Sequence, residues 1–320
     1  MTSILLSLLP LITPILSLQS PLQRTTGNPI LPGWYADPEA RIFGHTYYIY
    51  PTYSAAYEAQ TFFDAFSSPD LLTWTKHPHI LNLTAIPWST NRAAWAPSVG
   101  RSLAGDYFMY FSAGDGAGIG VAKSVTGRPE GPFEDARGTP LVGSTVFGAE
   151  PIDAQVFRDD DEEQRVWLYF GGWSHAVVVE LEQDMVTLKG EYKEITPPGY
   201  VEGPWMMKRE GVYYLMYSVG GWGDNSYGVS YVTGSSPTGP FSNTSTQILQ
   251  GNDRVGTSTG HNSVFTPDGE EYYIVYHRRP VNETERDHRV VCIDRMEFDD
   301  DGNILPVAIT TDGVEGRPLH

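Results

Sequence analysis

The chain has 320 residues, a formal net charge of −18, and many glycine, proline and aromatic residues (33 Gly, 24 Pro, 19 Tyr and 8 Trp). This acidity argues against nucleic acid and against an anionic membrane surface as partners, because basic patches bind both. The composition, without any segment of sustained helical periodicity, predicts many short strands joined by tight turns. We therefore expect a single all-β domain, since such a domain can reach this length.

The first residues are predicted to be a leader and to lie outside the fold. Ile4–Leu18 is an apolar run, interrupted by Pro10 and Pro14, that is too short to cross a bilayer comfortably. We interpret it as a secretory signal peptide over residues 1–20, with the folded domain over residues 21–320. Because no Lys or Arg precedes the run, an uncleaved amphipathic leader is the alternative. Three sequons favour a secreted, extracellular protein that leaves the membrane after cleavage; they begin at Asn82, Asn243 and Asn282.

Five short aromatic segments recur along the chain, and their first residues lie 60, 59, 47 and 59 positions apart. Self-similarity at such a period is typical of propellers and arrays. Turn signals around each segment leave room for one strand before it and two after it, which predicts a five-bladed β-propeller. We expect the aromatic side chains to pack between blades. The segments are 47–50 (YYIY), 107–111 (YFMYF), 166–170 (VWLYF), 213–217 (YYLMY) and 272–276 (YYIVY).

Each aromatic segment is preceded, 10 to 13 positions earlier, by a residue suited to chemistry or to ligand contact. A propeller brings the same point of every repeat to its central axis, so these five residues are predicted to share one pocket. They are Asp37, Trp95, Asp153, Glu202 and His261.

The end of the chain is predicted to complete the last blade. Residues 289–298 and 303–307 are expected to form two further strands after the fifth aromatic segment, beside the N-terminal segment. Cys292 is the only cysteine, so no disulfide forms within the chain, and its apolar neighbours predict a buried thiol without a catalytic part.

Three acidic residues stand in apolar, mostly proline-rich settings. Asp37 precedes Pro38, Glu202 lies two residues before Pro204, and Asp153 follows Ile152. Poor solvation raises the pKa of a carboxyl group toward the range where it donates a proton near neutrality. One such acid alone is ordinarily a turn cap or an ion-pair partner. Three acids at the same phase of the repeat favour a catalytic site. Glycosidic bond cleavage requires a pair of carboxyl groups, one protonated and one ionised.

The motifs around these residues resemble those of glycoside hydrolase family 43, whose members are five-bladed propellers that act on arabinose- and xylose-containing plant polysaccharides. The resemblance covers roughly residues 28–310. The motifs are 35–38 (YADP), 95–98 (WAPS), 152–154 (IDA), 202–204 (EGP) and 260–263 (GHNS).

The resemblance implies a role for each acid in an inverting mechanism. Asp37 matches the general base that activates water, and Glu202 matches the general acid that protonates the leaving oxygen. Asp153 matches the third acid, which tunes the pKa of the general acid and whose negative charge is expected to keep the proton on Glu202. His261 matches an axial histidine that in several members binds calcium, directly or through water. No cofactor is required, and calcium would be structural.

Further residues are expected to contact the sugar. Trp34 and Trp95 are predicted to stack on it, whereas for Trp205 we favour packing between blades. Arg289 matches an arginine that contacts the terminal sugar in the xylosidases of the family, and Arg278 or Arg279 is the alternative for that role.

The expected activity is release of terminal α-L-arabinofuranosyl or β-xylosyl units, by a secreted monomer, from plant polysaccharides or their oligosaccharides. Endo-arabinanase and exo-galactosidase activities are alternatives within the same family. A fructan- or sucrose-processing propeller is a third alternative, although Ala36 stands where those enzymes have Asn before the Asp-Pro pair. A propeller that binds carbohydrate without catalysis is the fourth.

Overall fold

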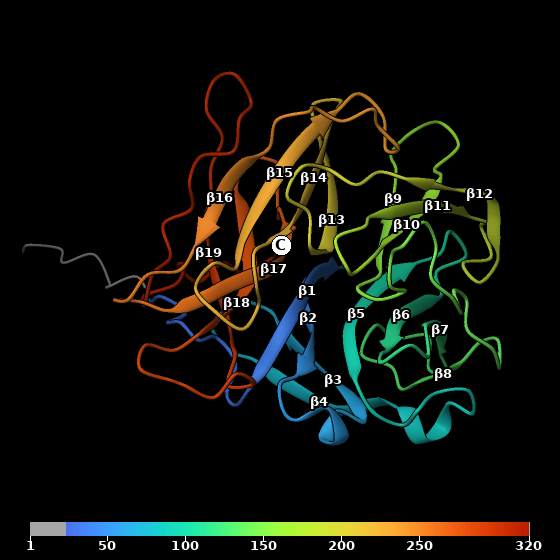
Figure 1. Cartoon of the computed structure of the whole chain (residues 1–320). Coiled ribbons are helices and arrows are strands. Elements are labelled where there is room, and N and C mark those ends of the chain that lie inside the picture. The colour runs from blue at the N-terminus through green and yellow to red at the C-terminus, as the bar shows by residue number, and fades with distance from the viewer. Residues whose placement is uncertain (1–23, 320) are drawn as a thin grey trace, which may run out of the picture.

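The computed structural model describes residues 24–319, so the predicted leader over residues 1–20 lies outside the described residues. Five antiparallel sheets surround a central axis, and this confirms the predicted all-β, five-bladed propeller (Figure 1). Two short 3-10 helices, η1 (Tyr57–Ala59) and η2 (Leu83–Ala85), lie in the connections of the first blade. No helix within residues 24–319 is long and apolar enough to cross a membrane.

Four of the blades contain four strands each, and the first strands of neighbouring blades contact one another around the axis. The five aromatic segments form the second strands, as predicted. Blade 1 contains β1 (Tyr35–Phe43), β2 (Thr46–Tyr53), β3 (Phe62–Ser68) and β4 (Thr75–Asn82). Blade 2 contains β5 (Ala94–Arg101), β6 (Tyr107–Ala113), β7 (Ile119–Ser124) and β8 (Phe133–Asp135). Blade 3 contains β9 (Gln155–Arg158), β10 (Val166–Phe170), β11 (Val177–Leu181) and β12 (Leu188–Glu194). Blade 4 contains β13 (Glu202–Arg209), β14 (Val212–Val219), β15 (Gly228–Gly234) and β16 (Thr246–Gln250).

Blade 5 has three strands, β17 (Thr257–Phe265), β18 (Tyr272–Arg279) and β19 (Val290–Met296), and the N-terminal segment lies along its outer edge. The Asn28 side chain donates to the carbonyl of Ile293 and accepts from its N–H, both at 2.9 Å. The expectation of a further strand over residues 303–307 in this blade is wrong. Because the edge of β19 is taken, Val307 instead donates its N–H to Ile248 of β16 in blade 4.

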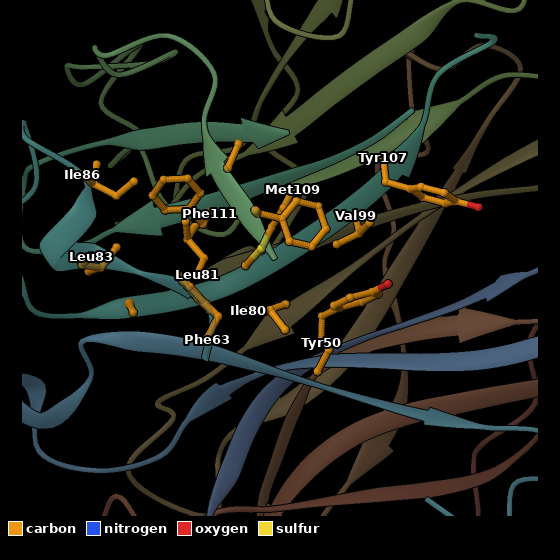
Figure 2. Close-up of a cluster of buried hydrophobic side chains, with 14 of the residues drawn as sticks. Tyr50, Phe63, Ile80, Leu81, Leu83, Ile86, Val99, Tyr107, Met109 and Phe111 are labelled. Carbon is orange, nitrogen blue, oxygen red and sulfur yellow. The ribbon is translucent and has the colours of Figure 1, made fainter. Parts of the chain in front are cut away.

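Aromatic side chains fill the spaces between blades, as predicted. Figure 2 shows the cluster between blades 1 and 2, where Tyr50 and Phe63 face Met109 and Phe111. Each buried hydroxyl of three equivalent tyrosines reaches a backbone carbonyl of the next blade, so burial of the ring leaves no unpaired polar group. These bonds join Tyr50 to Pro129 (2.9 Å), Tyr110 to Met185 (2.7 Å) and Tyr169 to Pro237 (2.6 Å). Cys292 is fully buried, which confirms the prediction of a buried thiol.

An equivalent residue at or just before the start of each first strand adopts the left-handed conformation, and in four of the blades it lies at a β-bulge. A bulge interrupts the pleat, so it turns one side chain out of the sheet toward the axis. Left-handed backbone is unfavourable for residues other than glycine, and such strain is common at functional sites. The five residues are Asp37 (φ 47°), Ala96 (φ 41°), Asp153 (φ 57°), Gly203 (φ 62°) and His261 (φ 48°).

Two residues after this position, a polar side chain joins four of the five blades to the next. Each of these four side chains accepts a backbone N–H from the following first strand. The bonds run from Val99 to Glu39 (2.7 Å), Val156 to Ser98 (2.9 Å), Met206 to Gln155 (2.7 Å) and Ala40 to Ser263 (2.9 Å). Trp205 holds the fifth position, where its buried ring packs beneath Arg41 (4.9 Å), as expected for a packing residue.

We expect Ser263→Ala to lower the free energy of unfolding by roughly 2–4 kcal/mol. Ser263 accepts from Ala40 and donates to the carbonyl of Pro38, so its loss strands two buried backbone groups between the last and first blades. Urea unfolding monitored by fluorescence measures the change, with the exposed Ser144→Ala as control. A change below about 0.5 kcal/mol would show that this junction does not limit stability.

Candidate active site

A pocket with an open volume of about 440 Å³ lies at the axis, where first strands begin and second strands end. Three acids from blades 1, 3 and 4 meet in it, so residues far apart in the chain converge as predicted. Its lining residues are Asp37, Tyr57, Trp95, Ile152, Asp153, Glu202, Trp222, His261 and Arg289.

The three acids do not share one phase of the repeat, which corrects the sequence interpretation. Asp37 and Asp153 are the left-handed residues of their blades, whereas Glu202 comes one residue earlier and pairs with Ser218 of β14. In blade 4 the left-handed residue is Gly203, and a Cβ there would lie only 3.2 Å from His261 Nδ1. The close blade 5 histidine and the left-handed backbone (φ 62°) favour glycine at position 203, and the acid precedes it at position 202.

Asp37 is the ionised acid of the site. Arg289 Nη1 lies 3.1 Å from its Oδ1, and the Nδ1 atoms of His277 and His261 lie at 3.2 and 3.4 Å. Burial by itself would raise the pKa of Asp37, but the Arg289 guanidinium more than offsets it and holds the pKa well below its usual range. The expectation that desolvation would dominate at Asp37 is therefore wrong.

Glu202 is protonated over much of the neutral range. Burial, with the negative charges of Asp37 and Glu150, raises its pKa to about 7. The Tyr227 hydroxyl donates to Glu202 Oε1 at 2.7 Å and, with Arg289, keeps the pKa from rising further. A carboxyl group with this pKa can donate a proton near neutrality, which agrees with the expectation from its apolar setting.

Asp153 also has a pKa raised well above its usual range, first by burial and then by the charges of Glu202, Asp37 and Glu150. Because Asp153 and Glu202 repel each other when both are ionised, the pair retains at least one proton near neutral pH. The role of Asp153 in tuning the pKa of Glu202 stays a prediction, which the mutual charge effect of the two acids supports.

Blade 3 lacks the side chain that accepts a backbone N–H in the other blades, and this affects Asp153. In blades 1, 2, 4 and 5, the end of the second strand presents a side chain that accepts the N–H of the next left-handed residue. The acceptors are Thr52, Ser112, Ser218 and His277. Gly171 stands at the equivalent point of blade 3, where its N–H bonds to Ile152. Without a hydroxyl there, the Gly203 N–H donates to the Asp153 carboxyl group and lowers its pKa.

Four residues of the site were not found from the sequence. Tyr57 and Trp222 line the pocket, while Tyr227 and His277 contact the acids from behind. Tyr227 is held by close packing, since a Cβ on Gly260 would lie 2.1 Å from its ring. A repeated Gly-Gly-Trp sequence after two second strands, at 171–173 and 220–222, was the available signal for Trp222.

Arginine and aromatic side chains form the pocket wall. The Trp222 ring lies 4.0 Å from the Arg286 guanidinium and 5.0 Å from that of Arg289, within the range of cation–π contact. Trp95 lines the pocket as predicted, meets Tyr57 edge-on at 5.0 Å, and donates from its indole nitrogen to Gln60. This combination of arginines, aromatic faces and carboxyl groups suits a neutral, hydroxyl-rich ligand.

Comparison with known proteins identifies the family. Residues 26–304 match the family described as Glycosyl hydrolases family 43. The chain belongs to glycoside hydrolase family 43. It is 71% identical to the β-D-galactofuranosidase xynD of Aspergillus niger, over 98% of this chain and 96% of that protein. It is 30% identical to an arabinoxylan arabinofuranohydrolase of Bacillus subtilis, over 78% of this chain and 55% of that protein.

Solved family 43 structures share the fold. A Bacillus subtilis arabinoxylan arabinofuranohydrolase in complex with cellotetraose superposes with a TM-score of 0.76 at 27% identity, covering 92% of this chain and 71% of that one. An α-L-arabinofuranosidase of Clostridium thermocellum superposes with a TM-score of 0.72 at 30% identity, covering 87% of this chain and 95% of that one. This family 43 glycosidase is thus similar to enzymes named for different sugars.

Two predicted sugar contacts lie elsewhere. Trp34 stacks on His288 with ring centroids 4.3 Å apart and does not line the pocket. Arg278 is buried and donates to the carbonyl of Thr310 at 2.7 Å, on the side of β18 turned away from the pocket. Because side chains alternate along a strand, Arg279 points the other way and supports the Trp222 loop through the carbonyl of Gly223 (3.0 Å).

The protein donors around His261 do not form a cage for calcium. Calcium takes six to eight oxygen ligands. Residues 24–319 contain no group of three or more carboxylate, imidazole or thiol side chains placed to hold a metal ion. His261 itself is neutral near pH 7, since burial lowers its pKa despite the nearby Asp37. Calcium at His261 stays a prediction, and the described residues would leave most of its ligands to water.

We expect Tyr227→Phe to move the basic limb of the pH profile of kcat/KM upward by roughly one unit. The Tyr227 hydroxyl stabilises ionised Glu202, so its removal raises the pKa of Glu202 and keeps that acid protonated to higher pH. Tyr217→Phe is the matched control, because its hydroxyl donates to the carbonyl of Pro198. A basic limb that stays in place would mean that Glu202 does not set it.

Proposed function

We propose that this family 43 enzyme is an inverting, exo-acting hydrolase that releases terminal furanosyl units, with β-D-galactofuranose as the preferred sugar. The mechanism rests on two carboxyl groups in one pocket with opposite pKa shifts, since the pKa of Asp37 is held well below its usual range and that of Glu202 is raised to about 7. The aromatic side chains of Tyr57, Trp95 and Trp222 wall the pocket around the acids, which supports binding of a chain end.

In the proposed reaction, Asp37 takes a proton from a water molecule while that water attacks the anomeric carbon. Glu202 gives its proton to the glycosidic oxygen as the bond between that oxygen and the anomeric carbon breaks. Attack from the face opposite the leaving group inverts the anomeric configuration. Asp37 ends protonated and Glu202 ionised, and exchange with solvent restores both. Arg289 supports the step by keeping Asp37 ionised before attack.

The choice of sugar rests on the relatives and on sugar chemistry. The Aspergillus niger relative at 71% identity is named a β-D-galactofuranosidase. β-D-Galactofuranose has the ring configuration of α-L-arabinofuranose and adds one hydroxymethyl group outside the ring. A pocket that fits β-D-galactofuranose admits α-L-arabinofuranose with fewer contacts. α-L-Arabinofuranose is therefore the second candidate, and the more distant arabinofuranosidases support it. β-Xylosyl release, expected from the motifs, is the third, because the xylosyl ring is six-membered.

We also infer a secreted enzyme whose substrate is a polysaccharide or oligosaccharide. The sequon residues Asn243 and Asn282 are exposed, as glycosylation requires, and support secretion. Action as a monomer stays a prediction.

We expect kcat/KM for p-nitrophenyl β-D-galactofuranoside to exceed that for the α-L-arabinofuranoside by about tenfold or more, since one hydroxymethyl group contributes roughly 1–3 kcal/mol to discrimination. The β-xyloside should be slower still. Proton NMR of the first product should show the inverted anomer. A xyloside turned over faster than both furanosides would reverse the assignment of the sugar, and a retained anomer would exclude the mechanism.

We expect Glu202→Gln to lose about 10²–10⁴-fold in kcat on glycosides with a sugar leaving group. The loss should be much smaller with a dinitrophenyl leaving group, which departs without a proton. Asp37→Asn should lose activity on both substrates, because neither reaction proceeds without activated water. The exposed Glu163→Gln is the control. Equal losses on both substrates for Glu202→Gln would remove this residue from the acid role.

A further inference from the structure

Two exposed aromatic side chains stand on the same face of the propeller as the pocket. Within residues 24–319, Trp173 (63% exposed) and Phe147 (54% exposed) are the aromatic residues that solvent reaches most freely. Trp173 lies in the turn after β10, and Phe147 lies in the turn that leads to β9. Since the pocket lies where second strands end and first strands begin, both turns belong to the pocket face.

The turn of Trp173 is attached to the general acid and to the pocket wall. The N–H of Ser174 donates to the carbonyl of Val201, the residue immediately before Glu202, at 3.1 Å. At the base of the turn, a Cβ on Gly172 would lie 2.8 Å from Ile152, which lines the pocket. The turn that carries Trp173 therefore adjoins both the residue before Glu202 and the pocket wall.

The two turns also support each other. Glu150 and Gly172 form a β-bridge that connects them, and a Cβ on Gly148 would lie 2.9 Å from the His175 ring. Phe147 (φ 50°) and Trp173 (φ 52°) both hold the left-handed conformation, which aromatic residues seldom adopt. Backbone that is strained to expose an apolar ring indicates a function outside the core.

The sister turn in blade 4 shows that this exposure is not a general property of the repeat. The same Gly-Gly-Trp sequence follows β14, where Trp222 turns into the pocket between Arg286 and Arg289. In blade 3 the tryptophan instead faces solvent. One tryptophan is thus part of the sugar pocket, and its counterpart is free on the adjoining surface.

We propose that Trp173, assisted by Phe147, is a stacking platform for the part of the glycan that leaves with the proton from Glu202. The inference rests on the proposed function. In an inverting reaction the leaving group departs on the side of the acid, so the remainder of the saccharide extends past Glu202. Trp173 is the exposed ring on that side. Sugar rings carry flat faces of C–H groups that suit an aromatic surface, while their hydroxyl groups stay in water.

The test compares a galactofuranosyl-terminated tetrasaccharide with methyl β-D-galactofuranoside, whose leaving group is too small to reach the platform. The readout is kcat/KM on the tetrasaccharide divided by kcat/KM on the methyl furanoside. Trp173→Ala should lower this ratio roughly three- to tenfold. Trp173→Phe should restore most of the ratio, and Phe147→Ala should lower it less than Trp173→Ala. Leu103→Ala is the control, because Leu103 is 62% exposed in the β5–β6 turn on the opposite face.

A second readout does not depend on turnover. In the Glu202→Gln background, calorimetry with the tetrasaccharide should show a Kd three- to tenfold higher when Trp173 is Ala. One outcome is that wild-type enzyme hydrolyses both substrates while neither the ratio nor the Kd changes in Trp173→Ala. That result would show that Trp173 is not a stacking platform, and it would leave the proposed function intact. Equal losses on both substrates would assign Trp173 to the pocket itself. No hydrolysis of either furanoside by wild-type enzyme would overturn both proposals.

Discussion

The left-handed residue near the start of every first strand is the constraint on which the site depends. It turns a side chain out of the sheet toward the axis, and the N–H that it exposes must then find an acceptor on the neighbouring blade. Four blades supply that acceptor with a hydroxyl or imidazole group. Each strained residue is thereby held by the ring as a whole, so the carboxyl groups of Asp37 and Asp153 are positioned before any substrate arrives.

The one break in this pattern lies where the acids meet. Gly171 offers no side chain, and the Gly203 N–H is free to donate to Asp153. The same junction places Glu202 one residue out of phase with the other acids. The one position where the repeat lacks its acceptor side chain therefore lies beside the acids. Exceptions to a regular pattern of a fold are expected at functional sites.

Burial has opposite outcomes at the two principal acids because their neighbours differ. Asp37 is buried against the Arg289 guanidinium, which stabilises its charge. Glu202 is buried with a tyrosine hydroxyl for a partner and with negative charges nearby, so its proton is retained. Two carboxyl groups whose surroundings separate their pKa values in this way suit an acid and a base. The rest of the pocket wall, in contrast, includes residues between strands, such as Tyr57 and Trp222, and such connections vary most readily among proteins of one fold.

The sequence by itself determined the number of blades and the region of the chain that meets at the axis. Both follow from local patterns, namely aromatic segments at a regular period and chemically apt residues at a fixed distance before them. The alternation along β18, which directs Arg279 rather than Arg278 toward the pocket side, depends on register and was not predicted. The sequence also placed the N-terminal segment beside the last blade, but only the tertiary structure decided that this segment, rather than residues 303–307, takes the outer edge of β19.

Only the tertiary structure decided which acid keeps its proton. The Arg289 guanidinium that fixes the charge of Asp37 lies 252 positions away in sequence, and the Tyr227 hydroxyl reaches Glu202 from 25 positions away. A pKa responds to charges within a few ångströms whatever their distance along the chain. Periodicity predicts that residues meet at an axis, but it contains no information on which side chains then touch.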